Sequence, residues 1–136
     1  MDIQISNESF GEAEQVHQIT EQAFINAPHT DHSEQYIVDA LRHAGALTIS
    51  QVAKVDGEAI GHVAISPVTL SSGIPGWFGL GPISVLHEHQ RRGVGSKLMK
   101  SSLAALEALG ASGCVVLGDP DYYRRFGFKV VDGLVY

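Results

Sequence analysis

Residues 90–99, QRRGVGSKLM, place two arginines directly before a Gly-x-Gly and then continue into an apolar segment. If a helix begins at these glycines, the backbone N–H groups of its first turn are unpaired and present positive potential to an anion. Gly93 and Gly95 let a ligand come close to the backbone, and Arg91 and Arg92 add charged hydrogen-bond donors. The pattern predicts a site for a phosphate-bearing ligand. The alternative is a glycine turn that enters a helix with both arginines in solvent.

Two common nucleotide-binding motifs do not match this segment. A P-loop requires Gly-Lys-Ser/Thr at its end, and no such sequence follows Gly95. A dinucleotide-binding motif requires a third glycine three residues after Gly95, and Leu98 occupies that position. Neither ATP nor NAD is therefore the expected ligand.

Length and composition limit the kind of protein further. With 136 residues, the chain is expected to form one domain, 1–136, that buries a core of its own. Its 15 acidic residues against 9 basic ones give a net charge of −6, which argues against general nucleic-acid binding. The only cysteine, Cys114, excludes an intrachain disulfide and a zinc site built from cysteines. With no signal peptide or membrane-spanning run, we expect a cytoplasmic protein without a membrane partner.

Seven histidines raise the question of a metal site. The close pairs are His29 with His32 and His87 with His89. Neither pair has a third ligand at a spacing that a metal site would need. No metal is therefore expected.

The pattern of apolar and turn residues predicts the elements that position these groups. Ser9 and Glu12 form a capping box at the start of a helix, and Asp56-Gly57 is a strong hairpin signal. The predicted order is β-α-α-β-β-β-α-β-α-β, which indicates an α/β (α+β) fold around one sheet. The strands are expected at 3–6, 47–55, 58–70, 77–86, 114–118 and 128–136, and the helices after Ser9, from Glu34, over 94–109 and after Asp119.

Two segments carry a family resemblance. ISVLHEHQRRGVGSKLM resembles the central acetyl-CoA motif of the GNAT N-acetyltransferases, and DYYRRFGF (121–128) resembles the second hallmark of that family. The order of elements matches as well, so the resemblance covers nearly the whole chain. It implies a mixed, mostly antiparallel central sheet flanked by helices. It also implies transfer of an acetyl group from acetyl-CoA to a primary amine of an unidentified acceptor, by direct attack.

The resemblance assigns positions to the acetyl-CoA site. In the family, backbone groups of the strand before the loop bond the pantetheine arm, and the loop cradles the pyrophosphate with its N–H groups. The matching strand residues here are Ile83 and Val85. The matching loop residues are Arg91, Arg92, Gly93, Val94, Gly95 and Ser96.

The catalytic groups are less completely assigned. The resemblance implies Tyr123 as general acid, because a neutral phenol can give a proton to the leaving thiolate. Adjacent helical residues point in different directions, so Tyr122 is expected to pack in the core. For the general base, strand 77–86 offers no carboxylate, and His62 on the preceding strand is a candidate whose alternative is a structural role. Glu34 and the loop around His29 and His32 match the region of the family's substrate cleft, and a solvated loop is the alternative.

The C-terminal segment departs from the family pattern. Typical members carry one more strand after the strand that matches GFKVV, and this chain ends at Tyr136. Either the chain is a shortened version of the domain, or a second copy supplies the missing strand. Because unpaired strand edges are usually covered or paired, we expect a homodimer. A non-catalytic acyl-CoA-binding or regulatory domain is the main alternative function, and a structural module without a ligand is the third.

Overall fold

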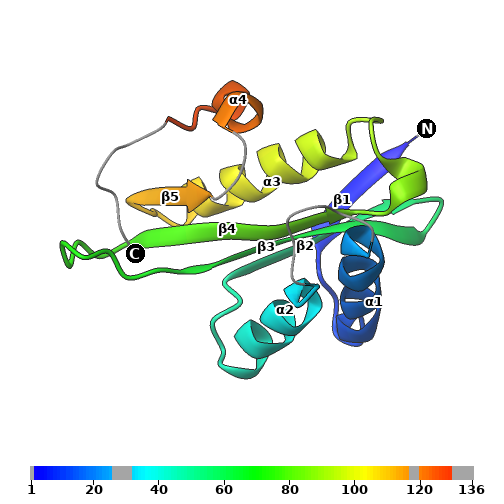
Figure 1. The fold of residues 1–136 in the computed structure, drawn as a ribbon, viewed down its shortest axis with the longest axis horizontal. Helices are drawn as coiled ribbons and strands as arrows, with labels where there is room; N and C mark the ends of the chain where they lie inside the picture. The colour runs from blue at the N-terminus through cyan, green and yellow to red at the C-terminus, as the bar shows by residue number, and fades with distance from the viewer. Residues whose placement is uncertain (1, 26–31, 117–119, 130–136) are drawn as a thin grey trace.

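A five-stranded sheet organises the fold (Figure 1), and the computed structural model describes residues 2–25, 32–116 and 120–129. The strands follow one another in space as they do in the chain. β1 to β4 are antiparallel, and β5 pairs in parallel with β4, so the predicted mixed, mostly antiparallel sheet is confirmed. The strands are β1 (Ile3–Asn7), β2 (Ile49–Val55), β3 (Glu58–Pro67), β4 (Trp77–Val85) and β5 (Gly113–Val116).

Helices cover both faces of this sheet. In Figure 1, α1 (Ala13–Phe24) and α2 (Glu34–His43) lie below it, and α3 (Val94–Ala108) lies above it. The short α4 (Pro120–Tyr123) continues into a 3-10 turn, η2 (Arg124–Phe126), on the same side as α3. Another 3-10 turn, η1 (His87–His89), joins β4 to the loop before α3. The predicted order of elements is confirmed as far as α4. Most of the strand predicted over 128–136 lies outside the described residues.

The two faces of the sheet bury separate apolar clusters. On one face, Val63 of β3 packs with Leu98 and Met99 of α3, and all three are fully buried. A Cβ on Gly61 would lie only 3.1 Å from the Leu98 side chain, which shows how closely α3 approaches the sheet. On the other face, the buried valines of α1, α2 and β2 form a second cluster: Val16, Val38 and Val52.

The structure contains the hairpin turn and part of the helix cap that short sequence motifs predict. Asp56 and Gly57 both have positive φ, 52° and 79°, as a type I′ hairpin between β2 and β3 requires. The Ser9 N–H donates to Glu12 Oε1 at 2.6 Å, which is one arm of the predicted capping box. The helix itself begins later than predicted, at Ala13. No helix in the described part of the chain is both long enough and apolar enough to cross a membrane.

Candidate active site

β4 leaves β5 halfway along its length. Its parallel pairing with β5 ends at Leu80, which is opposite Val116. On the β3 side, Leu80 pairs with Ile65 and Ile83 pairs with Val63, so two residues of β4 stand opposite one residue of β3. This bulge bends β4. Among the described residues, the second half of β4 therefore has no partner strand on its β5 side, which leaves an opening in front of α3.

A pocket of about 440 Å³ lies at this opening. Its wall includes β4, the loop that follows η1, the first turn of α3, and the α4–η2 segment. Of the eight residues expected to hold the cofactor, Arg92 does not belong to the wall. The seven that the structure brings together there are Ile83, Val85, Arg91, Gly93, Val94, Gly95 and Ser96.

The backbone at the start of α3 exposes hydrogen-bond donors. Gly93 caps the helix with φ at 82°, a left-handed conformation that glycine adopts without strain. The hydrogen bond from the Lys97 N–H to the Gly93 carbonyl, 3.1 Å long, closes the first turn. The N–H groups of Val94, Gly95 and Ser96 therefore precede the helical hydrogen-bond ladder, at the positive end of the helix dipole.

The charges around the pocket are cationic. Arg91 and Arg125 both belong to its wall, whereas none of its described lining residues is a carboxylate. Gln90 also lies in the wall, and its side chain donates to the Val85 carbonyl at 3.1 Å. Together with the helix N-terminus, the two arginines make a site that is suited to a polyanion.

Tyr122 belongs to the pocket, and the expectation that it packs in the core is wrong. Its side chain is 37 % exposed, and a Cβ built on Gly95 would lie 3.4 Å from its hydroxyl oxygen. The guanidinium of Arg125 lies 4.3 Å from the centroid of its ring. The single turn of α4 directs Tyr122 toward the start of α3, which a pattern of apolar residues could not predict.

Tyr123 lies behind Tyr122, half-buried against the core cluster on the α3 face. Its ring meets the rings of Tyr122 and Phe128 edge to face, at centroid distances of 5.0 and 6.0 Å. Burial, followed by the neighbouring Tyr122, raises the pKa of the Tyr123 phenol above its usual value of 10. The phenol therefore keeps its proton at neutral pH. Phe126 and Phe128 pack against the same cluster, as expected.

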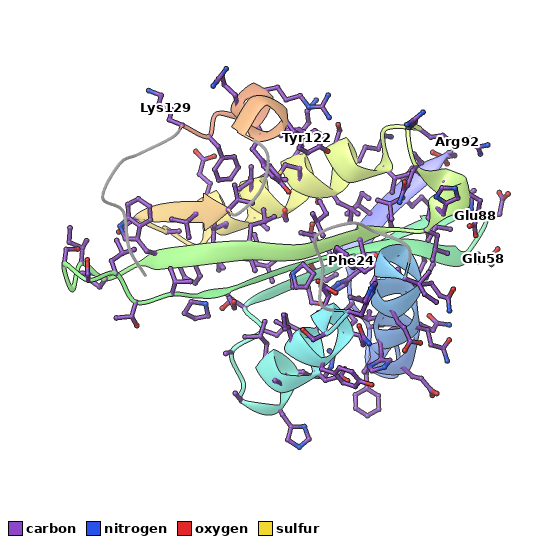
Figure 2. All side chains as sticks on the ribbon, viewed as in Figure 1. Phe24, Glu58, Glu88, Arg92, Tyr122 and Lys129 are labelled. Carbon is purple, nitrogen blue, oxygen red and sulfur yellow. The ribbon has the colours of Figure 1, made fainter. Side chains whose placement is uncertain are left out.

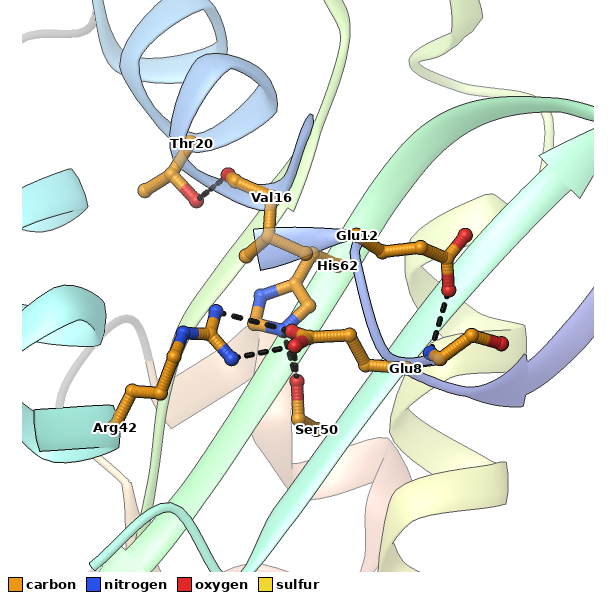
Figure 3. Close-up of polar contacts among 8 residues, drawn as sticks. Glu8, Glu12, Val16, Thr20, Arg42, Ser50 and His62 are labelled. Carbon is orange, nitrogen blue, oxygen red and sulfur yellow. Dashed lines mark hydrogen bonds and ion pairs between the residues drawn. The ribbon is translucent and has the colours of Figure 1, made fainter. Parts of the chain in front are cut away.

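His62 lies on the opposite face of the sheet, fully buried in a polar network (Figure 3). Its Nε2 is 2.7 Å from the Ser50 hydroxyl, which donates to Glu8 Oε1 at 2.8 Å. Arg42 binds both carboxylate oxygens of Glu8, at 2.5 and 3.1 Å. Desolvation, followed by the charge of Arg42, lowers the pKa of His62 to about 4. The imidazole is therefore neutral at pH 7.

The hydrogen bonds of this network fix the tautomer of His62. Because the single Ser50 hydroxyl proton goes to Glu8, Nε2 of His62 must carry the proton that Ser50 accepts. Nδ1 is then the free base, and it has no hydrogen-bond partner among the described residues. His62 is not part of the pocket wall. Glu8, Arg42 and Ser50 were not predicted, because no motif links positions so far apart in the chain.

Glu34 and His32 are not part of the pocket wall. Glu34 begins α2 and is half-buried, His32 has φ at 61°, and His29 is outside the described residues. His89 belongs to the pocket wall, in η1. Across residues 2–25, 32–116 and 120–129, no three His, Cys, Asp or Glu side chains are grouped so that they could hold a metal ion.

Known proteins resemble this chain over most of its length. The family model "Acetyltransferase (GNAT) domain" matches residues 47–130. The uncharacterized N-acetyltransferase YhbS of Escherichia coli K12 is 37 % identical over 99 residues, which are 72 % of this chain but only 59 % of YhbS. The chain therefore spans less than two thirds of that curated relative.

Solved structures give the same result. A GNAT family acetyltransferase from Brucella melitensis, crystallised in complex with acetyl-CoA, is 49 % identical with a TM-score of 0.91, over 95 % of this chain and 84 % of that one. The structure of Escherichia coli YhbS in complex with CoA is 32 % identical with a TM-score of 0.84, over 93 % of this chain and 68 % of that one. The chain belongs to the GNAT acetyltransferase family.

Proposed function

We propose that residues 1–136 form one acetyl-CoA-dependent N-acetyltransferase domain, which transfers an acetyl group to a primary amine of an unidentified acceptor. The observation that carries this proposal is the junction of the bent β4 with the open N-terminus of α3, in a pocket with two arginines and no described carboxylate. The complexes of two related proteins with acetyl-CoA and with CoA support it.

The pocket fits the parts of acetyl-CoA in order. Ile83 and Val85 lie beyond the last described pair between β4 and β5, so backbone groups on that side can bond the amides of the pantetheine arm. The Val85 carbonyl already accepts a hydrogen bond from the Gln90 side chain. The pantetheine arm would have to displace that side chain or share the carbonyl with it. The first-turn amides of α3 and the Arg91 side chain suit the pyrophosphate. Arg92 is proposed to contribute through the backbone of the same loop.

The chemistry is a direct displacement. The amine nitrogen forms a C–N bond with the acetyl carbon, the C–S bond breaks, and the sulfur leaves as a thiolate that takes a proton. Tyr123 is the proposed donor of that proton, and its raised pKa supports this role because the phenol stays protonated at neutral pH. A separate base must take the proton that the attacking amine loses.

We propose His62 as this general base. The atom that could accept the proton is Nδ1, which has no hydrogen-bond partner among the described residues. A pKa of about 4 makes His62 a weak base, and it is fully buried beside Glu8 and Ser50. These observations also fit a structural role in which His62 stabilises the polar network. Replacing His62 by Gln separates the two, because a base would affect turnover more than the stability of the fold.

The experiment that tests the function combines binding with turnover. Calorimetry with CoA is expected to show binding, and thiol release from acetyl-CoA is expected with at least one member of a panel of amines. The panel should contain polyamines, aminoglycosides, amino acids and peptides with a free N-terminus or lysine. Binding without turnover on any amine would instead favour a non-catalytic acyl-CoA-binding domain. The observation that favours this alternative is that none of the described pocket residues is a carboxylate that could act as general base. Absence of CoA binding would contradict both.

We also propose that the protein is a cytoplasmic homodimer. β5 lies at one end of the described sheet, and its edge away from β4 has no partner strand among the described residues. A second copy could cover this edge. The cytoplasmic location stays a prediction from the sequence.

A further inference from the structure

Arg125 reaches from η2 across the pocket to the start of α3. Its Nη2 donates to the Ser96 hydroxyl at 3.4 Å. Its guanidinium lies 4.3 Å from the ring centroid of Tyr122 and 5.0 Å from that of Phe126. Figure 2 shows Tyr122 on the side of α4 that faces α3. The guanidinium is therefore held at the same helix end whose amides open into the pocket.

The contacts of Arg125 differ in strength. Two aromatic rings orient its guanidinium through cation–π contact, which reduces the side-chain entropy lost when it binds a ligand. The contact with Ser96, by contrast, is long and involves a neutral acceptor, so it is weak. An anionic phosphate oxygen would be a stronger acceptor for the same N–H groups. A bound phosphate would therefore replace Ser96 as the partner of Arg125.

We propose that Arg125 binds the pyrophosphate of acetyl-CoA and that Tyr122 positions it for this contact, an inference that rests on the proposed function. The donor is then held from two sides, by the backbone of the α3 turn and by a side chain of η2. Arg125 also lies two residues after Tyr123, so binding of the pyrophosphate ties down the segment that carries the proposed acid.

The test compares Arg125→Gln with the unaltered protein by calorimetry on three ligands. These are CoA, dephospho-CoA, which lacks only the 3′-phosphate, and pantetheine, which carries no phosphate. We expect the variant to bind CoA and dephospho-CoA about tenfold more weakly, the size expected for one charged hydrogen bond. Affinity for pantetheine should not change. A loss with CoA that disappears with dephospho-CoA would move the contact to the 3′-phosphate and overturn the proposal.

Arg124→Gln is the matched control, because it removes the same charge from the residue directly before Arg125. Arg124 is exposed and is not part of the pocket wall. An equal loss of CoA affinity in this variant would mean a general effect of charge and would contradict a specific contact.

The role of Tyr122 is tested by two variants. Tyr122→Phe should keep the affinity for CoA and Tyr122→Leu should lower it, because only the phenylalanine keeps a ring beside Arg125. If the unaltered protein binds CoA and Arg125→Gln binds it equally well, this inference alone fails. If the unaltered protein does not bind CoA, the proposed function fails with it.

Discussion

At the scale of single residues, the two adjacent tyrosines occupy different environments. Tyr122 faces the pocket and the guanidinium of Arg125, whereas Tyr123 is half-buried among aromatic rings. The raised pKa keeps the Tyr123 phenol protonated at neutral pH, and the phenolate that forms when it gives up its proton must take up another proton before the next turnover. In the function that we propose, these two neighbouring residues have separate roles, since Tyr122 positions a donor-binding side chain and Tyr123 donates a proton.

Replacing Tyr123 by Phe is expected to lower kcat about a hundredfold, the lower end of what general acids contribute. The KM for acetyl-CoA should change little, since the phenylalanine ring keeps the contacts with Tyr122 and Phe128. Steady-state kinetics with an accepted amine measures both values. Tyr122→Phe is the control, because it removes a hydroxyl from the neighbouring ring. An unchanged kcat in Tyr123→Phe would exclude Tyr123 as the acid.

At the scale of elements, the sequence predicted the parts that local chemistry determines. The hairpin at Asp56-Gly57 needs positive φ at both positions, and α3 needs a glycine before an apolar stripe, so both could be recognised from adjacent residues. The bulge at which β4 leaves β5 depends on pairing with two other strands, and no local pattern encodes it. The network of Glu8, Arg42 and His62 has the same origin, since the end of β1, α2 and β3 bring its members together only in the fold.

This network makes the stability of the fold dependent on pH. The pKa of His62 falls from 6.5 to about 4 on folding, so between these values the unfolded chain binds the extra proton. The contribution of His62 is complete above pH 6.5 and is lost as the pH falls toward 4. The shift corresponds to about 3 kcal/mol of unfolding free energy. Glu8, Arg42 and Ser50 are the polar groups that the structure places around the imidazole.

Urea unfolding between pH 7.5 and 4.5 measures this dependence. The unaltered protein should lose stability more steeply than His62→Gln as the pH falls, so that the difference between the two shrinks. The variant removes only the titrating group and keeps a side chain that can hydrogen-bond to Ser50. Parallel pH profiles for the two proteins would show that His62 does not titrate as described.

At the scale of the whole molecule, the sheet separates two kinds of environment. The α3 face carries the pocket with its arginines, although the chain as a whole has a net charge of −6. Positive potential is therefore local, supplied by one helix end and a few side chains, and does not need a basic protein. The α1 and α2 face carries the valine cluster and the buried histidine. Successive side chains of a strand point to opposite faces, so the adjacent His62 and Val63 of β3 belong to different environments.

The edges of the sheet bear on how copies of the chain associate. In the part of the chain that the structure describes, the sheet ends in β1 on one side and β5 on the other. β5 has four residues, of which Val115 is buried, and no other strand of residues 2–25, 32–116 and 120–129 pairs with its outer edge. An edge of this kind can pair with a strand of another chain.

The mass in solution tests this pairing. Since one chain has a mass of 14.6 kDa, light scattering at micromolar concentration should give twice that value if a second copy covers the edge. A mass that stays at one chain as the concentration is raised would contradict the homodimer. It would not affect the proposal for the pocket at the start of α3, because residues of one chain line that pocket.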